Sequence, residues 1–158
     1  MSTSDPDALF QGALGAAAED DHTTALRLLK AAADAAPERA DIAYALGAEY
    51  GYVELFDAAE AQMDRALGLD ADAHAARMHL GLLLITRSRF PEAMAAWQPL
   101  GVLPKGHALR RYKAAFDALA EDRLGEARDH IEAGLAAKGS DRYIDDQMRR
   151  LQASLPGA

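Results

Sequence analysis

The sequence has no cysteine among its 158 residues, and only 6% of its residues are aromatic. The missing cysteine excludes disulfide bonds, thiolate nucleophiles and zinc sites that need a thiolate ligand. Long apolar runs are absent as well, because none comes near the roughly 20 residues that a helix needs to cross a bilayer. The sequence therefore predicts neither a disulfide framework nor a membrane-spanning helix.

Positive charge is scarce. Lysine and arginine together number 17 against 25 acidic residues, which gives a net charge of −8. Such a surface stays soluble and repels phosphate backbones and anionic lipids, so we expect neither nucleic acid nor a membrane as the main partner. Residues 1–15 lack the basic and apolar parts of a secretory signal, which predicts a cytoplasmic protein. The excess of arginine over lysine, 13 to 4, together with abundant alanine indicates a bacterial source.

Motifs for catalysis are missing too. The phosphate-binding patterns G-x-x-x-x-G-K-[ST] and G-x-G-x-x-G and the hydrolase pattern G-x-S-x-G do not occur. The five histidines form no H-E-x-x-H pair, so we expect them to face solvent or to cap helices. The acidic groups at 19–21 and 145–146 have no evident apolar surroundings and are expected to be solvated. We therefore predict a protein that is not an enzyme and uses no metal and no cofactor.

Alanine, in contrast, is abundant, with 37 residues. It is the best helix former, and its small side chain lets helices pack closely. The composition predicts an all-α protein.

Segments of the sequence are alike at a spacing of 34 residues. One column consists of alanines, namely Ala25, Ala59, Ala93 and Ala127. Four residues later stand large apolar residues, namely Leu29, Met63, Trp97 and Ile131. Twelve residues before the alanines stand small residues, namely Ala13, Gly47, Gly81 and Ala115. Small side chains in two columns allow two helices of each unit to cross closely.

This pattern resembles the tetratricopeptide repeat, a helix–turn–helix unit of 34 residues. Residues 45–71 (ALGAEYGYVELFDAAEAQMDRALGLDA) and 79–97 (HLGLLLITRSRFPEAMAAW) carry the resemblance best. The resemblance implies a right-handed α-solenoid that forms one domain over residues 1–158. Its units would span about 6–39, 40–73, 74–107 and 108–141, with a capping helix at about 142–154. Pro99, inside the second helix of unit three, is expected to kink or shorten that helix.

The resemblance also implies that the first helix of each unit lines a concave groove. The inward-facing positions are largely apolar, namely Phe10, Leu14, Tyr44, Ala48, Tyr52, Met78, Leu82, Ile85, Leu109, Tyr112 and Phe116. Large exposed apolar patches usually mark interaction sites. We therefore predict an adaptor, or a chaperone-like protein, whose groove binds an apolar or amphipathic segment of another protein.

Chaperone-cofactor members of the family hold an acidic carboxylate with lysine and asparagine side chains, and the matching positions here lack that set. Three alternatives to a foreign partner stay open. The groove could join two copies of the chain in a homodimer, it could be closed by the terminal helix, or the chain could be a structural subunit that uses another face. The tail supplies apolar residues at a spacing that suits packing on unit four, namely Tyr143, Ile144, Met148 and Leu151.

Overall fold

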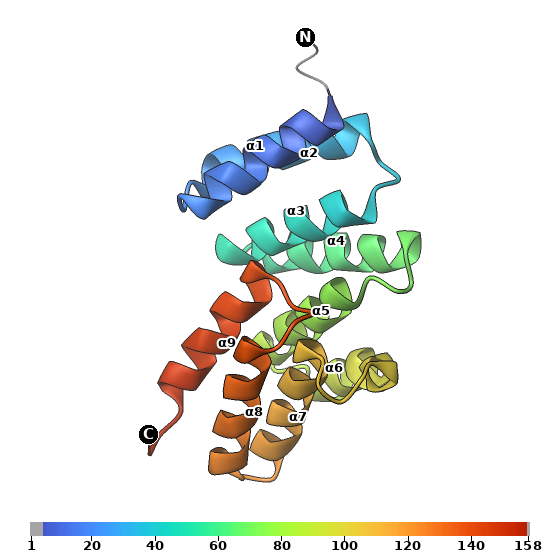
Figure 1. Cartoon of the computed structure of the whole chain (residues 1–158). Helices are drawn as coiled ribbons and strands as arrows, with labels where there is room; N and C mark the ends of the chain where they lie inside the picture. The colour runs from blue at the N-terminus through green and yellow to red at the C-terminus, as the bar shows by residue number, and fades with distance from the viewer. Residues whose placement is uncertain (1–4, 158) are drawn as a thin grey trace.

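The computed structural model describes residues 5–157, which fold into α-helices joined by short turns, with no strand among them (Figure 1). The helices are α1 (Pro6–Ala18), α2 (His22–Ala35), α3 (Ala40–Tyr52), α4 (Phe56–Leu69), α5 (His74–Thr86), α6 (Phe90–Trp97), α7 (Ala108–Ala120), α8 (Leu124–Ala136) and α9 (Arg142–Ser154), with a 3₁₀ helix, η1 (Gln98–Val102), after α6. Within the described residues, no helix combines the length and the apolar character that crossing a membrane requires.

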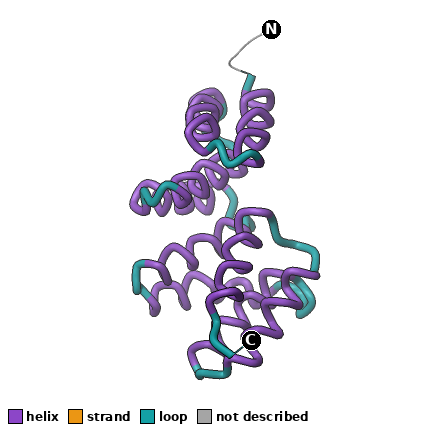
Figure 2. The backbone as a smooth tube through the Cα atoms, turned by 90° about the vertical axis from the view of Figure 1, so that its left-hand side faces the viewer, coloured by secondary structure: helices purple, strands orange, loops and turns teal. Residues whose placement is uncertain are grey.

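The first eight helices pack as four hairpins, α1 with α2, α3 with α4, α5 with α6 and α7 with α8. Successive hairpins stack, since α2 lies on α3 and α4 lies on α5. Figure 2 shows the resulting array from the side, with the hairpins following one another from the N-terminal to the C-terminal end. The predicted all-α fold, a solenoid of stacked helical hairpins, is confirmed.

The turn within each hairpin has the same geometry in all four units. One residue of each turn has a positive φ between 59° and 63°, and these residues are again 34 apart, namely Asp20, Glu54, Ser88 and Asp122. The next backbone N–H donates to the carbonyl five residues before it, as Arg89 does to Leu84 (2.8 Å). This is the hydrogen bond of a Schellman helix end, in which the left-handed residue is usually glycine. The structure thus adds a fourth periodic feature, which the sequence analysis did not identify.

The repeat columns lie in the core. All four column alanines and the four large residues that follow them are fully buried. Helices α5 and α6 cross so closely that a Cβ at Gly81 would lie 1.8 Å from Nε1 of Trp97. No side chain fits there, so the glycine lets the indole ring pack directly on the α5 backbone.

Pro99 ends α6 early, as predicted. The α-helix stops at Trp97, and the chain continues as η1, because proline has no N–H to donate to an α-helical hydrogen bond. Leu100 of η1 is fully buried and belongs to the same apolar cluster as Trp97. Trp97 also donates from Nε1 to the Met78 carbonyl (3.0 Å), which fixes α6 against α5.

Helix α9 turns back along the array. The turn before it contains Gly139 at a φ of 104°, and Asp141 caps the helix by accepting from the Ile144 N–H (3.0 Å). From there α9 packs on α8 and on α5, and Figure 1 shows it running beside α5, α7 and α8. The C-terminal helix therefore contacts both the unit that it follows and unit three, whose first helix lies far from it in sequence.

Candidate protein-binding groove

Helix α9 covers the inward-facing positions of units three and four. Met78, Leu109 and Tyr112 are at most 1% exposed, and they share one apolar cluster with Ile144 and Met148 of α9. Leu82 and Phe116 belong to the same cluster and are buried too, and Ala48 of unit two is buried in the neighbouring cluster. The lining that the sequence analysis expected to be continuous is therefore divided into a covered part and an open part.

The open part lies at the N-terminal end of α9, between α1 and α3. Phe10, Leu14 and Tyr44 are partly exposed there and line a cleft of about 370 Å³, which we call the N-terminal cleft. Its remaining lining is Asp41, Ala45, Asp141, Arg142 and Tyr143. Three of the predicted groove residues thus come together on one open surface.

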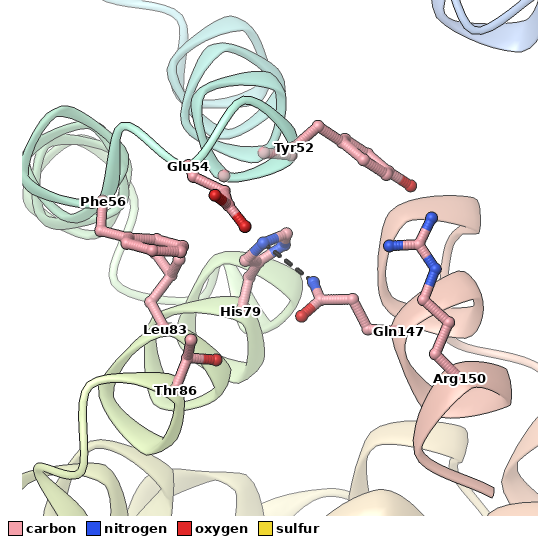
Figure 3. A pocket seen from close by; sticks show the side chains of 10 residues that line it. Tyr52, Glu54, Phe56, His79, Leu83, Thr86, Gln147 and Arg150 are labelled. Atoms are coloured by element: carbon pink, nitrogen blue, oxygen red, sulfur yellow. Dashed lines mark hydrogen bonds between the residues drawn. The ribbon is translucent and has the colours of Figure 1, made fainter. Parts of the chain in front are cut away.

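A second cleft, the middle cleft, has a volume of about 150 Å³ and lies between α3, α5 and α9. Figure 3 shows Tyr52, His79, Gln147 and Arg150 around it, with the two last residues reaching in from α9. The predicted groove residue Tyr52 therefore borders a more polar cleft than Tyr44 does.

A third cleft, the C-terminal cleft, has a volume of about 160 Å³ and lies next to the middle cleft, with which it shares Thr86 and Gln147. It is lined by Leu82, Ile85, Thr86, Phe116, Gln147, Met148 and Leu151. Ile85 is the predicted groove residue of unit three that stays partly exposed.

Aromatic rings connect α9 with α2 and α3. The ring of Tyr143 lies edge-on to Tyr44, with centroids 6.1 Å apart, and 5.9 Å from Tyr52. Tyr52 in turn stacks on His22 at 4.5 Å. Such edge-on and stacked pairs are favourable beyond the area they bury. The start of α9 is therefore held by unit two as well as by unit four.

Three polar contacts fasten α9 across the groove. Tyr112 donates its hydroxyl to Asp145 (2.6 Å), and Tyr52 donates to Asp146 (3.1 Å). Burial, together with Asp145, keeps the pKa of Tyr112 well above its ordinary value, so this phenol stays a donor. The expectation that the acidic pair at 145–146 is merely solvated is wrong, because both carboxylates accept hydrogen bonds from groove tyrosines.

The third contact joins the Gln147 amide to Nε2 of His79 (3.1 Å). His79 is 1% exposed, and this burial lowers its pKa to about 4. The imidazole is therefore neutral, with one ring nitrogen as donor and the other as acceptor. The prediction that the histidines face solvent or cap helices is wrong for His79, whereas His107 does cap α7 by accepting from the Leu109 N–H (3.1 Å).

Several buried polar atoms beside α9 lack a well-formed hydrogen bond. Glu49 is fully buried, its Oε1 contacts Nδ1 of His22 (2.6 Å), and the Tyr143 hydroxyl faces its carboxylate without ordinary hydrogen-bond geometry. The Tyr44 hydroxyl faces the Asp141 carboxylate in the same way, and Nδ1 of His79 is buried without a partner. Buried polar groups are nearly always well paired in native proteins, so this cluster beside one helix is unusual.

The arrangement offers binding surface rather than reactive groups. Across residues 5–157, no three potential metal-ligating side chains come together. The N-terminal cleft is lined mainly by hydrocarbon, which suits an apolar side chain. A stacked helical array with such a groove defines a class of protein, the α-solenoids that present an extended concave surface.

Within that class, solved structures similar to this chain are tetratricopeptide-repeat proteins. MamA superposes with a TM-score of 0.67 at 16% identity, covering 95% of this chain and 81% of its own. YrrB, described as a TPR protein with an unusual peptide-binding site, has a TM-score of 0.64 at 20% identity over 96% of this chain and 75% of its own. PilF of Pseudomonas aeruginosa has a TM-score of 0.64 at 21% identity over 83% of this chain and 60% of its own.

The chain therefore has the tetratricopeptide-repeat fold that the 34-residue columns predicted. At these identities the likeness concerns the fold, which is typical of non-catalytic scaffolds for protein–protein interaction. No protein-family model matches the sequence, and no curated protein matches it either.

Proposed function

We propose that this protein is an adaptor, or a chaperone-like protein of the cytoplasm, that binds an apolar or amphipathic segment of another protein in its concave groove. The observation that carries the proposal is the N-terminal cleft, an apolar hollow of about 370 Å³ beside α9. Its position on the first helices of two units is where solenoids bind their partners.

The size and lining of the cleft suit one or two bulky apolar side chains. Burying one such side chain contributes roughly 1.5–3 kcal/mol before the cost of ordering the segment. Two anchors in the cleft, together with contacts along the rest of the segment, would support binding in the micromolar range, which is about −8 kcal/mol. Tyr44 adds a rigid amphipathic ring, of the kind that is enriched at interfaces.

The structural neighbour YrrB supports the proposal of peptide binding, since its description names a peptide-binding site. Carrying peptide binding over to this chain is part of the proposal. The residues that we place in the interaction are Phe10, Leu14 and Tyr44, with Tyr52 and Ile85 at the edges of the neighbouring clefts.

The test is a peptide selection on the purified protein. A library of random 15-residue peptides is displayed on phage, and the recovered peptides are measured by fluorescence anisotropy. We expect peptides with bulky apolar residues at helical spacing and dissociation constants in the micromolar range, roughly −8 kcal/mol. Leu14→Glu should weaken their binding about tenfold or more, because it places a charge in the cleft.

Val102→Glu is the matched control, because Val102 is 80% exposed on η1 and does not line the N-terminal cleft. Equal binding by both variants, or recovered peptides without apolar anchors, would contradict the proposal. Sedimentation of the free protein covers the homodimer alternative. A dimer that dissociates on Leu14→Glu would mean that a second copy of the chain is the occupant of the cleft.

A further inference from the structure

Helix α9 fits the groove incompletely. The N-terminal, middle and C-terminal clefts all border it, and each is lined in part by α9 residues, such as Tyr143, Gln147 and Met148. All three clefts are open to solvent, so α9 does not fill the concave face on which it lies. The open spaces beside α9 therefore indicate a groove that is wider than the helix now in it.

The polar atoms beside α9 give a second, independent sign. Nδ1 of His79 is buried there without a partner, while the buried hydroxyls of Tyr44 and Tyr143 face the carboxylates of Asp141 and Glu49 without reaching ordinary hydrogen-bond geometry. Such poorly paired atoms weaken the docked position of α9, because docking removes their water without returning a full hydrogen bond. An element that is meant to stay in place usually has its buried polar groups satisfied.

The composition of α9 is also compatible with a solvent-exposed helix outside the groove. Five of its thirteen residues are charged, namely Arg142, Asp145, Asp146, Arg149 and Arg150. The turn that connects it to α8 contains Gly139 in a left-handed conformation, and glycine is the residue that changes its backbone angles at the lowest cost. Released from the groove, α9 would expose a narrow apolar stripe of Tyr143, Ile144, Met148 and Leu151.

From these three features we propose that α9 occupies the groove in which this protein binds its partner. The partner is an amphipathic helix that displaces α9. This inference rests on the proposed function and names the partner's form. The incoming helix carries an aromatic and an aliphatic residue side by side, and further aliphatic residues four and seven positions after that pair, as α9 does. Its carboxylates face Tyr112 and Tyr52.

Replacement of α9 joins the three clefts into one groove. It uncovers part of Met78, Tyr112 and Phe116, which stand at inward-facing repeat positions and share one buried cluster with Ile144 and Met148 of α9. The covered and open parts of the groove are then two sections of one helix-binding site.

The first test uses the full chain and a labelled synthetic peptide with the sequence of residues 141–155, DRYIDDQMRRLQASL. In the chain, Met148→Asp weakens the docking of α9 because it buries a charge, while the peptide keeps its methionine. We expect the peptide to bind Met148→Asp about tenfold or more tightly than the wild type, since the competing helix is removed. Ala153→Ser, on the exposed side of α9, should bind it as the wild type does.

The second test needs no variant. Hydrogen exchange of the wild-type amides should show α9 opening at a lower free energy than α3 and α5, because it leaves the groove while the hairpins stay folded. If Met148→Asp does not fold, Asp145→Ala in the chain replaces it, since this change removes the α9 carboxylate that accepts from Tyr112 while the peptide keeps its own.

Exchange of α9 only through global unfolding, together with equal peptide affinity of wild type and variant, overturns the inference. The failure of the proposed function looks different. If selected apolar peptides bind the N-terminal cleft equally well in both proteins, the cleft is a binding site and only the displacement is refuted. If no peptide binds even when α9 is released, the proposed function fails as well.

Discussion

The two halves of the concave face are built from the same repeat but differ in how far their inward-facing side chains are exposed to solvent. In units one and two, Phe10, Leu14 and Tyr44 stay partly exposed around an open cleft. In units three and four, the corresponding positions Met78 and Tyr112 are fully buried beneath α9. The repeat thus specifies which side chains point inward, whereas the helix that follows the last unit decides which of them meet solvent.

The helix crossings beneath the two halves differ as well. At Gly47 in unit two, a Cβ would lie 3.0 Å from the flexible end of Met63. At Gly81 in unit three, it would overlap the rigid indole of Trp97. The C-terminal half, which supports α9, is therefore the less tolerant of the two.

The largest effect should come from Gly81→Ala, which breaks this crossing. The added methyl group forces Trp97 away from α5 and should lower the free energy of unfolding by about 3 kcal/mol or more, at the upper end of overpacking effects. Gly47→Ala should cost about 1–2 kcal/mol, because Met63 can move and alanine favours the helix, while the Ala59 carbonyl oxygen, 3.1 Å from the new Cβ, must shift slightly. Urea unfolding followed by circular dichroism measures both. Equal losses in the two variants would show that the halves do not differ in packing tolerance.

The second-largest effect is a pH dependence of the free energy of unfolding, and it arises in the covered half alone. The folded-state pKa of His79 is about 4, below the value of about 6.5 in an unfolded chain. Its contribution to stability is therefore present above pH 6.5 and is lost as the pH falls toward 4. Between pH 7.5 and pH 5 the loss should reach about 2 kcal/mol.

Urea unfolding of wild type and His79→Gln at both pH values isolates this contribution. The variant lacks the titrating ring, so its free energy of unfolding should fall by about 2 kcal/mol less over the same interval. Carboxylates and the other histidines titrate alike in both proteins and cancel in the difference. A variant that loses as much stability as the wild type would mean that His79 does not stay neutral beneath α9.

The smallest effect should be shared by both halves, because it is local to a turn. Ser88 and Asp20 hold left-handed conformations, at φ values of 60° and 59°. Replacing either by glycine removes the steric cost of the Cβ and should raise the free energy of unfolding by about 0.5–1 kcal/mol. Thermal unfolding should show similar increases for the two variants. A gain in only one half would indicate that the turns are not equivalent.

Much of the fold could be predicted from the sequence because each repeat column has one physical role. Ala59 and Ala93 are small where helices cross, Met63 and Trp97 fill the adjacent space, and Pro99 ends α6. The left-handed turn residues were missed because Asp20, Glu54, Ser88 and Asp122 share no side-chain type, and glycine, the usual signal, stands at none of them.

The candidate site was less predictable. The inward-facing positions could be named because they follow the repeat, and the apolar stripe of α9 was read as packing on unit four. Its contacts with unit two, through Tyr143 and the Gln147–His79 pair, depend on how far the chain turns at Gly139. Contacts between distant segments leave no periodic trace in a single sequence, so the burial of His79 could not be foreseen.

Trp97 is the only tryptophan in the sequence, and it is fully buried between Gly81 and the ring of Phe116 (centroids 4.8 Å apart). The intrinsic fluorescence of the protein therefore reports on unit three, while the far-ultraviolet circular dichroism reports on every helix. Coincident transitions by the two signals would mean that the array unfolds as one cooperative block, and separate transitions that its two ends melt independently. The single indole thus gives an unlabelled, site-specific optical reporter of how cooperativity spreads along the repeats.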